Sequence, residues 1–129
     1  VQPNGRFVYV ANRANGTTEF QGQRVFAGGE NSIAVFAVDQ QTGEPTLIQH
    51  ADAHGFSPRT FAIDPSGRLL IVNNSSPLLV REKDAVRSVL QSLSVFRVGG
   101  DGRLTFLRKY DQEAKGTDRF FWAGMVPLP

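Results

Sequence analysis

Two arginines stand at the ends of short apolar segments, next to residues that restrict the local chain. Arg13 follows Asn12 where one such segment ends, and Arg59 follows Pro58 where another begins. A guanidinium binds a carboxylate or phosphate through two hydrogen bonds, and it can also stabilise an oxyanion. We therefore predict Arg13 and Arg59 as catalytic residues and Asn12 and Asn74 as substrate contacts. Structural ion pairing of the arginines is the alternative.

Both histidines lie in one stretch of the chain, together with an acid. His50, Asp52 and His54 alternate, so in a strand they would project from one face, as metal ligands can. They precede Gly55 in what reads as a turn-rich connection, and this favours a solvated loop. We predict no metal site there. His54 alone is a candidate substrate contact or acid–base group, because the ordinary pKa of histidine is near neutral.

The composition is that of an ordinary globular chain with many turns. The 129 residues are 40% hydrophobic and 20% charged, with 13 Gly and 7 Pro at intervals, which favours many short strands. The absence of cysteine excludes disulfides and thiolate chemistry. The formal charge of +2 is scattered rather than clustered, so we predict no nucleic-acid partner. No apolar run reaches the roughly 20 residues of a membrane helix, and we predict no membrane partner. The compartment stays open, with the cytoplasm slightly favoured.

Residues 57–76, SPRTFAIDPSGRLLIVNNSS, predict a β-hairpin. Two short apolar segments flank a turn in which Pro65 presets φ, Asp64 can bond forward to the backbone, and Gly67 accepts a left-handed conformation. The apolar segments are too short for helices, so they are interpreted as strands.

The hairpin belongs to a repeat. PNGRFVYVANR at 3–13 matches PSGRLLIVNNS at 65–75, and SIAVFAV at 32–38 matches SLSVFRV at 92–98. Each copy is followed by a turn and a further strand-like segment. Such repeats indicate a solenoid, a propeller or an array. We predict an all-β fold, a β-propeller fragment of about two four-stranded antiparallel blades plus a closing strand. An all-β sandwich would explain the turns but not the repeat.

We therefore expect the whole chain to be the C-terminal part of one propeller domain. We predict a blade at 1–50 that lacks its first strand, a complete blade at 57–110 and a closing strand at 119–127, with Phe120, Phe121 and Trp122 in its core. The long connections 14–31 and 76–91 fall at the same end of the blades as all five candidate site residues. Residues 82–87, in the second connection, are expected as a short helix or, better, as a solvated loop.

The same motifs resemble those of the lactonase-type seven-bladed propellers, a family that includes 6-phosphogluconolactonases and carboxymuconate cyclases. The resemblance covers residues 3 to about 110 and implies the last two full blades with a closing strand. It implies lactone opening or closing without an obligatory metal, by arginine, histidine and glutamate residues around the channel. Arg13 matches the family's Asn-Arg, and Arg59 matches its Pro-Arg. The family's acid–base His and Glu belong to blades outside this chain.

The leading hypothesis is a lactonase-type propeller that hydrolyses or forms a lactone of an anionic sugar acid or muconate, with water as nucleophile. Its partners would be that small anionic molecule and the remaining blades of the same propeller. We expect no cofactor, and we expect the isolated chain to be inactive. Fold alone does not give function, so a non-catalytic binding or scaffold propeller is the alternative. A redox or metal propeller is the third hypothesis and would need a bound ion or cofactor.

Overall fold

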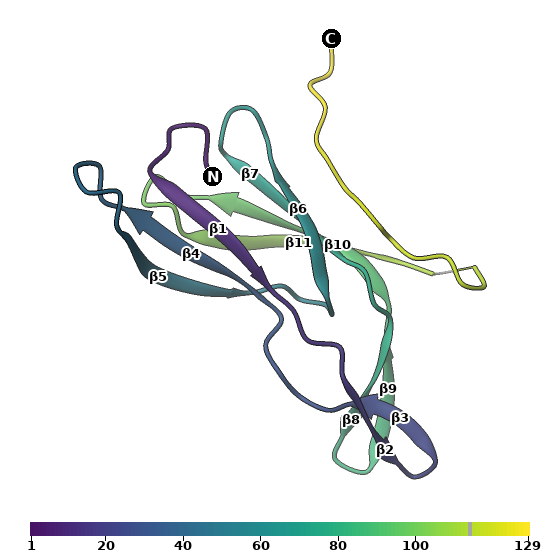
Figure 1. Ribbon diagram of the computed structural model, residues 1–129. Helices are drawn as coiled ribbons and strands as arrows, with labels where there is room; N and C mark the ends of the chain where they lie inside the picture. The colour runs from purple at the N-terminus through teal and green to yellow at the C-terminus, as the bar shows by residue number, and fades with distance from the viewer. Residues whose placement is uncertain (114) are drawn as a thin grey trace.

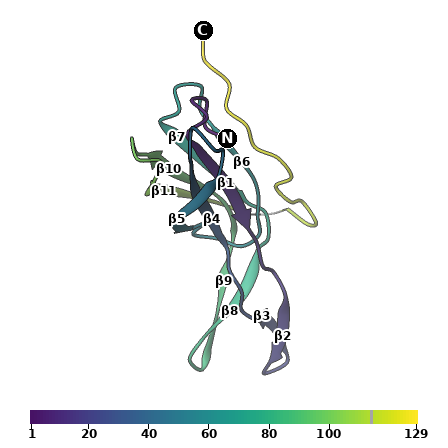
Figure 2. The same cartoon turned by 60° about the vertical axis from the view of Figure 1, so that its left-hand side comes forward.

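The computed structural model describes residues 1–113 and 115–129. These residues form eleven strands in three sheets and no helix (Figure 1). A helix long and apolar enough to cross a membrane is therefore also absent from the described residues. Two of the sheets lie face to face, and the third extends from one end of the pair (Figures 1 and 2). The predicted all-β fold is confirmed.

The predicted hairpin forms one half of a four-stranded sheet, at one of its edges. The sheet contains β6 (Pro58–Ile63), β7 (Leu69–Asn74), β10 (Gln91–Val98) and β11 (Leu104–Gln112), antiparallel and in that spatial order. The β6–β7 turn closes as its residue types predict. Asp64 Oδ1 accepts from the backbone N–H groups of Arg68 and Leu69 at 2.8 and 2.7 Å, and Gly67 has φ of 72°. The four-stranded antiparallel unit of a propeller blade is thus present.

The other large sheet has three strands. It consists of β1 (Phe7–Asn12), β4 (Ser32–Val38) and β5 (Pro45–Asp52), in the order β1-β4-β5. Strand β5 is longer than its apolar pattern indicates and includes His50 and Asp52. The interpretation of these two residues as part of a turn-rich connection is therefore wrong. They pair with β4 opposite Ala34 and Ser32, because the β4 backbone offers a ladder partner along its whole length.

The two large sheets bury their core between them. Alternate side chains on each strand point into this layer, as period-two patterning requires. Strands β1 and β4 contribute Phe7, Tyr9, Ile33 and Val35, and the facing sheet contributes Leu70, Val72, Phe96, Val98 and Leu104. Burial of each large apolar side chain stabilises the packing by about 1.5–3 kcal/mol. The sheets therefore pack as neighbouring blades rather than as independent units.

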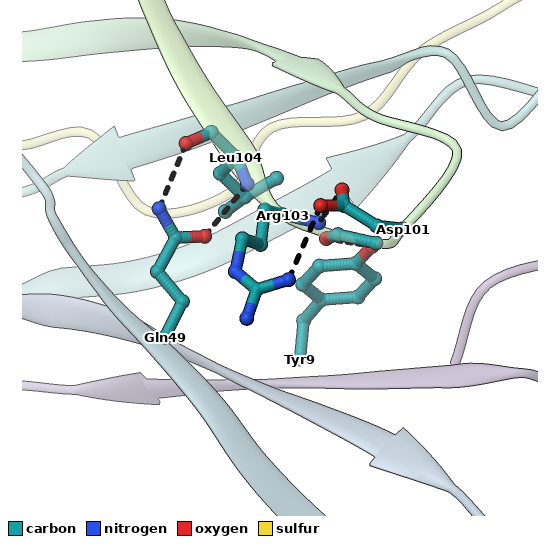
Figure 3. Close-up of polar contacts among 6 residues, drawn as sticks. Tyr9, Gln49, Asp101, Arg103 and Leu104 are labelled. Atoms are coloured by element: carbon teal, nitrogen blue, oxygen red, sulfur yellow. Dashed lines mark hydrogen bonds and ion pairs between the residues drawn. The ribbon is translucent and has the colours of Figure 1, made fainter.

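Polar contacts join the two sheets at the end where the tight turns lie (Figure 3). The Tyr9 hydroxyl donates to the carbonyl oxygen of Gly102 at 2.8 Å. Gln49 donates to the Leu104 carbonyl at 2.9 Å and accepts from the Leu104 N–H at 2.7 Å. An exposed ion pair of 3.1 Å joins Arg103 to Asp101 in the same turn. Side chains of the three-stranded sheet thus satisfy buried backbone groups of the four-stranded sheet.

The long connections contain strands that the sequence did not predict. Each connection forms a hairpin, and the two hairpins share a small sheet in the order β2-β3-β8-β9. A single parallel bridge, Val25 to Leu79, joins them. Residues 82–87 do not form a short helix, because they are the last residue of one strand, the turn of the second hairpin and the start of its return strand. Their side chains are mostly exposed, as the solvated alternative predicts. The strands are β2 (Thr17–Phe20), β3 (Gln23–Phe26), β8 (Leu78–Glu82) and β9 (Ala85–Val89).

The C-terminal segment runs past β6 without pairing as a strand. Residues 119–129 have no ladder partner among the described residues, so the closing strand predicted at 119–127 is not formed in this chain. Phe121 and Trp122 are 71% and 73% exposed, and the prediction that they lie in a core is wrong here. An extended segment with only one neighbour has no second surface to bury them. The part that the segment plays in a complete ring stays a prediction.

Candidate functional site

Arg13 and Arg59 meet in one pocket. The pocket has a volume of about 360 Å³, which is within the range of small-molecule sites. It lies where β1 and β7 end and β6 begins, at the end of the blades from which the hairpins leave. We call it the arginine pocket, and it is lined by Arg13, Asn15, Ser57, Arg59, Ser75, Ser76, Arg119, Phe120 and Phe121.

A β-bulge places Arg59. In the β6–β7 ladder Pro58 pairs with Asn74 and Thr60 pairs with Asn73, so Arg59 has no opposite residue. A bulge bends the strand and changes the direction of a side chain, and bulges are common beside active sites. The Arg59 guanidinium lies over the ring of Phe121, 4.3 Å from its centroid. The bulge thus presents Arg59 at the pocket rather than leaving it in the regular alternation of the sheet.

One side chain fixes both arginine-bearing segments. Oδ1 of Asn31 accepts from the backbone N–H of Ala14 at 3.0 Å and from that of Ser57 at 2.8 Å. Ala14 directly follows Arg13, and Ser57 stands two residues before Arg59. Asn31 was not predicted as a site residue from the sequence. A signal was available there, because Asn31 stands at the start of the repeated segment where another amide, Gln91, stands in the second copy. In the structure Gln91 likewise accepts from a backbone N–H, that of Phe120, at 3.1 Å.

Two of the serines that line the arginine pocket, Ser57 and Ser75, bond to each other. The carbonyl oxygen of Ser57 accepts from both the N–H and the hydroxyl of Ser75, each at 3.1 Å. Ser57 has φ of 54°, a left-handed conformation that non-glycine residues adopt rarely and that tends to occur at functional sites. Both side chains are buried. The connection between the two blades is therefore held tightly against the end of β7.

The arginine pocket is cationic. Its lining contains three arginines and no Asp or Glu. The ion pairs in the described part of the chain use Glu30, Glu82, Asp101 and Asp111, and none of them includes a pocket arginine. Like charges held close together without a counter-charge raise the local affinity for an anion. Arg119 was not singled out from the sequence, because nothing local marks it as a partner of residues 60 to 106 positions earlier.

The two asparagines lie outside this pocket. Asn12 Nδ2 donates to the Ser32 hydroxyl at 3.3 Å, within the three-stranded sheet. Asn74 is fully buried, and its Nδ2 donates to Ala53 O and to the hydroxyls of Ser92 and Ser94 at 3.0 to 3.2 Å. The structure thus gives Asn74 a role in holding the connection between the blades, and brings neither asparagine into the arginine pocket.

His54 lines a different pocket, between the blades and the hairpin sheet. This second pocket has a volume of about 370 Å³, and Arg87 and Lys109 also line it. The His54 ring stacks on Phe106 with centroids 3.8 Å apart and an interplanar angle of 20°. The backbone N–H of His54 donates to Asp52 Oδ1 at 2.7 Å. His54 is therefore not placed to exchange a proton with a molecule held by Arg13 and Arg59.

The His50 side chain bonds to the Glu30 carboxylate and does not join His54 in a shared metal site. The hydroxyl of Ser32 and, after it, His50 bond to the Glu30 carboxylate and hold the pKa of that group below its ordinary value. No group of three or more His, Asp or Glu side chains that could hold a metal ion occurs in residues 1–113 and 115–129. The alternation of His50, Asp52 and His54 therefore does not gather three ligands around one point.

Comparisons with known proteins agree with the repeat. Residues 1–117 match the family model described as "Lactonase, 7-bladed beta-propeller". The chain is 34% identical over 95 residues to a 6-phosphogluconolactonase of Formosa agariphila, a match that covers 72% of this chain and 23% of the relative. It is 35% identical over 94 residues to the 6-phosphogluconolactonase of Bacillus subtilis, covering 70% and 23%. No solved structure matches. The aligned part is thus about a quarter of the length of these curated relatives.

Proposed function

The chain belongs to the lactonase family of seven-bladed β-propellers, and we propose that it supplies the anion-binding part of a lactonase site within a complete propeller. The proposed substrate is a lactone of an anionic sugar acid such as 6-phosphogluconolactone, the compound in the names of both relatives. The observation that carries this proposal is the meeting of Arg13 and Arg59 in a pocket lined by no acid. We keep the cytoplasm as the proposed compartment.

The two arginines have different roles in the proposed reaction. One guanidinium holds the phosphate or carboxylate through paired hydrogen bonds, and this fixes the lactone ring in the pocket. The other lies near the lactone carbonyl and stabilises the oxyanion that forms when water adds to the carbonyl carbon. The ring C–O bond then breaks as the oxyanion re-forms the carbonyl, the alkoxide takes a proton, and the new carboxylic acid ionises to a carboxylate. The product is the open hydroxy acid.

Proton transfer is assigned to the remaining blades. No His, Asp or Glu lines the arginine pocket, and His54 lies in the second pocket. We propose that the base for the attacking water and the acid for the leaving alkoxide come from blades outside this chain. We propose that this hydrolysis needs no cofactor.

The test is an assay of the complete propeller on 6-phosphogluconolactone and on a muconolactone, with Arg13→Ala and Arg59→Ala. Loss of a charged hydrogen-bonding partner costs about 1.5–3 kcal/mol, so kcat/KM should fall about 10- to 150-fold. Arg6→Ala is the matched control, because Arg6 is exposed at the opposite, tight-turn end of the first blade. Unchanged kcat/KM in both pocket variants would remove these arginines from the mechanism.

A non-catalytic propeller is the second candidate, and the lack of an acid or base in the pocket lining favours it. Such a protein would bind 6-phosphogluconate without turning over its lactone. Titration calorimetry with 6-phosphogluconate, beside the lactone assay, separates the two. Binding that is lost in Arg59→Ala, together with no turnover by the wild-type protein, would favour the binding function.

A further inference from the structure

The C-terminal segment closes one side of the arginine pocket. Arg119, Phe120 and Phe121 line the pocket, although they follow its other lining residues by more than 40 positions. The segment follows β11, one edge strand of the four-stranded sheet, and runs past β6, the other edge strand (Figure 1). Two hydrogen bonds fix it on either side of Phe121. The N–H of Phe120 donates to Gln91 Oε1 at 3.1 Å, and the N–H of Ala123 donates to Thr60 Oγ1 at 3.2 Å.

Phe121 contacts Arg59 although its side chain is mostly exposed. An aromatic side chain that is 71% exposed contributes little to a core, yet its ring lies 4.3 Å from the Arg59 guanidinium. A guanidinium stacked on an aromatic face is attracted to it, and the contact restricts the rotamers of a long side chain. This contact uses none of the guanidinium N–H hydrogen bonds, so those groups remain free to bond an anion. Phe121 is thus placed to position Arg59 for binding.

Arg119 adds a third guanidinium to the pocket. Its Nη1 donates to the carbonyl oxygen of Asp118 at 2.8 Å, which anchors the head group and leaves its other N–H groups for a ligand. One guanidinium is enough to bind a carboxylate. A dianionic phosphate has three oxygens that accept hydrogen bonds, and it is best held by more than one cation. Three arginines without an acid therefore match a ligand that carries a phosphate in addition to the reacting carbonyl.

We infer that the segment 119–121 determines which lactone the pocket accepts: Arg119 is a phosphate contact, and Phe121 is a positioning residue for Arg59. This inference rests on the proposed function and goes beyond it by assigning discrimination between phosphorylated and unphosphorylated lactones to a segment outside the repeat.

The experiment uses the complete propeller and two substrates, 6-phosphogluconolactone and unphosphorylated gluconolactone. Arg119→Gln should raise KM for the phosphorylated lactone about tenfold, the loss expected when a charged partner is removed, and leave KM for the unphosphorylated one unchanged. Inorganic phosphate should inhibit the wild-type protein competitively and inhibit Arg119→Gln about tenfold less well. Arg119→Lys keeps the charge and should recover part of the loss, which also shows that the exchange at this position leaves the fold intact.

Phe121→Leu should lower kcat/KM for both substrates about two- to fivefold, because the ring that orients Arg59 is lost, and Phe121→Tyr should restore it. The matched control is Phe20→Leu. Phe20 forms the same kind of contact with Arg81, at 3.9 Å, in the hairpin sheet and outside the pocket. The control should leave both substrates unaffected.

These variants distinguish failure of the inference about segment 119–121 from failure of the proposed function. If Arg59→Ala lowers turnover while Arg119→Gln leaves the ratio of the two KM values unchanged, the inference about segment 119–121 is overturned and the proposed function stands. If Arg13→Ala and Arg59→Ala also leave both substrates unaffected, the proposed function itself fails.

Discussion

Replacement of Asn31 by alanine tests whether one side chain holds the two halves of the arginine pocket together. The change removes the oxygen that accepts from the N–H groups of Ala14 and Ser57. It leaves the backbone bond from the Ala53 N–H to the Asn31 carbonyl, at 3.0 Å, in place. The connection between the blades therefore keeps one anchor, and the effect is limited to the segments that carry Arg13 and Arg59.

The magnitude follows from the burial of the two donors. Ser57 is 5% exposed, so its N–H loses its partner where water has little access, at a cost of about 1–3 kcal/mol. Ala14 is only half-buried, and its N–H can bond to water instead, at a smaller cost. We expect Asn31→Ala to lower the free energy of unfolding of the complete propeller by about 2 kcal/mol in all. Because displaced arginines bind the anion less well, kcat/KM should fall about tenfold.

Urea unfolding and lactone kinetics measure the two effects. Asn31→Asp keeps an acceptor oxygen, so its unfolding midpoint should stay near that of the wild type, while the added carboxylate opposes anion binding and raises KM. Asn4→Ala is the matched control. Asn4 also accepts a backbone bond, from Arg6 at 2.9 Å, but in an exposed turn at the far end, and a loss below about 0.5 kcal/mol is expected. A wild-type midpoint and wild-type KM in Asn31→Ala would refute the reasoning.

Two further predictions concern the tight-turn end. Gly102→Ala should lower the free energy of unfolding by more than about 2 kcal/mol, because the new Cβ would lie 2.3 Å from the Phe7 ring and the backbone has φ of +83°. Gly100→Ala is the control and should be nearly neutral, because the space around Gly100 is open. Equal urea midpoints for the two variants would contradict this prediction. Burial, and after it the charge of Asp101, raise the pKa of Tyr9 from 10.0 to about 12. The neutral phenol is thus favoured in the fold, and its contribution to stability should be complete below pH 10 and lost as pH rises to about 12. Ultraviolet titration of phenolate absorbance in the wild type and Tyr9→Phe checks this, and a Tyr9 that ionises near pH 10 would exclude it.

Much of the fold could be predicted because it is encoded locally. The turn at 64–67 forms from the side-chain chemistry of Asp64, Pro65 and Gly67, and the alternation of apolar residues places the same faces inward in both copies of the repeat. The prediction that Arg13 and Arg59 share one end of the molecule needed only strand order, since strands of a meander alternate in direction. The pocket confirms that the two residues lie together. Their catalytic role stays a prediction.

The rest of the site could not be predicted, for a physical reason. The hairpins in the connections pair with each other only because neighbouring blades bring Val25 and Leu79 side by side. Asn74 looks like a surface residue at a strand end, but packing of the connection over it buries its amide completely. In the described part of the chain, residues 119–127 likewise lack a ladder partner because of the strands that lie near them, which the residues of the segment do not reveal.

The sequence by itself determined most of the strands of the two large sheets, the tight turns that join them and the repeat, because these depend on φ preferences and side-chain alternation within a few residues. Only the tertiary structure decided that a bulge presents Arg59, that Asn31 joins the two arginine-bearing segments, and that Arg119 and Phe121 complete the pocket. These features arise from contacts between residues far apart in the chain. Their geometry is set by how two sheets pack and where a connection crosses them, which no local pattern records.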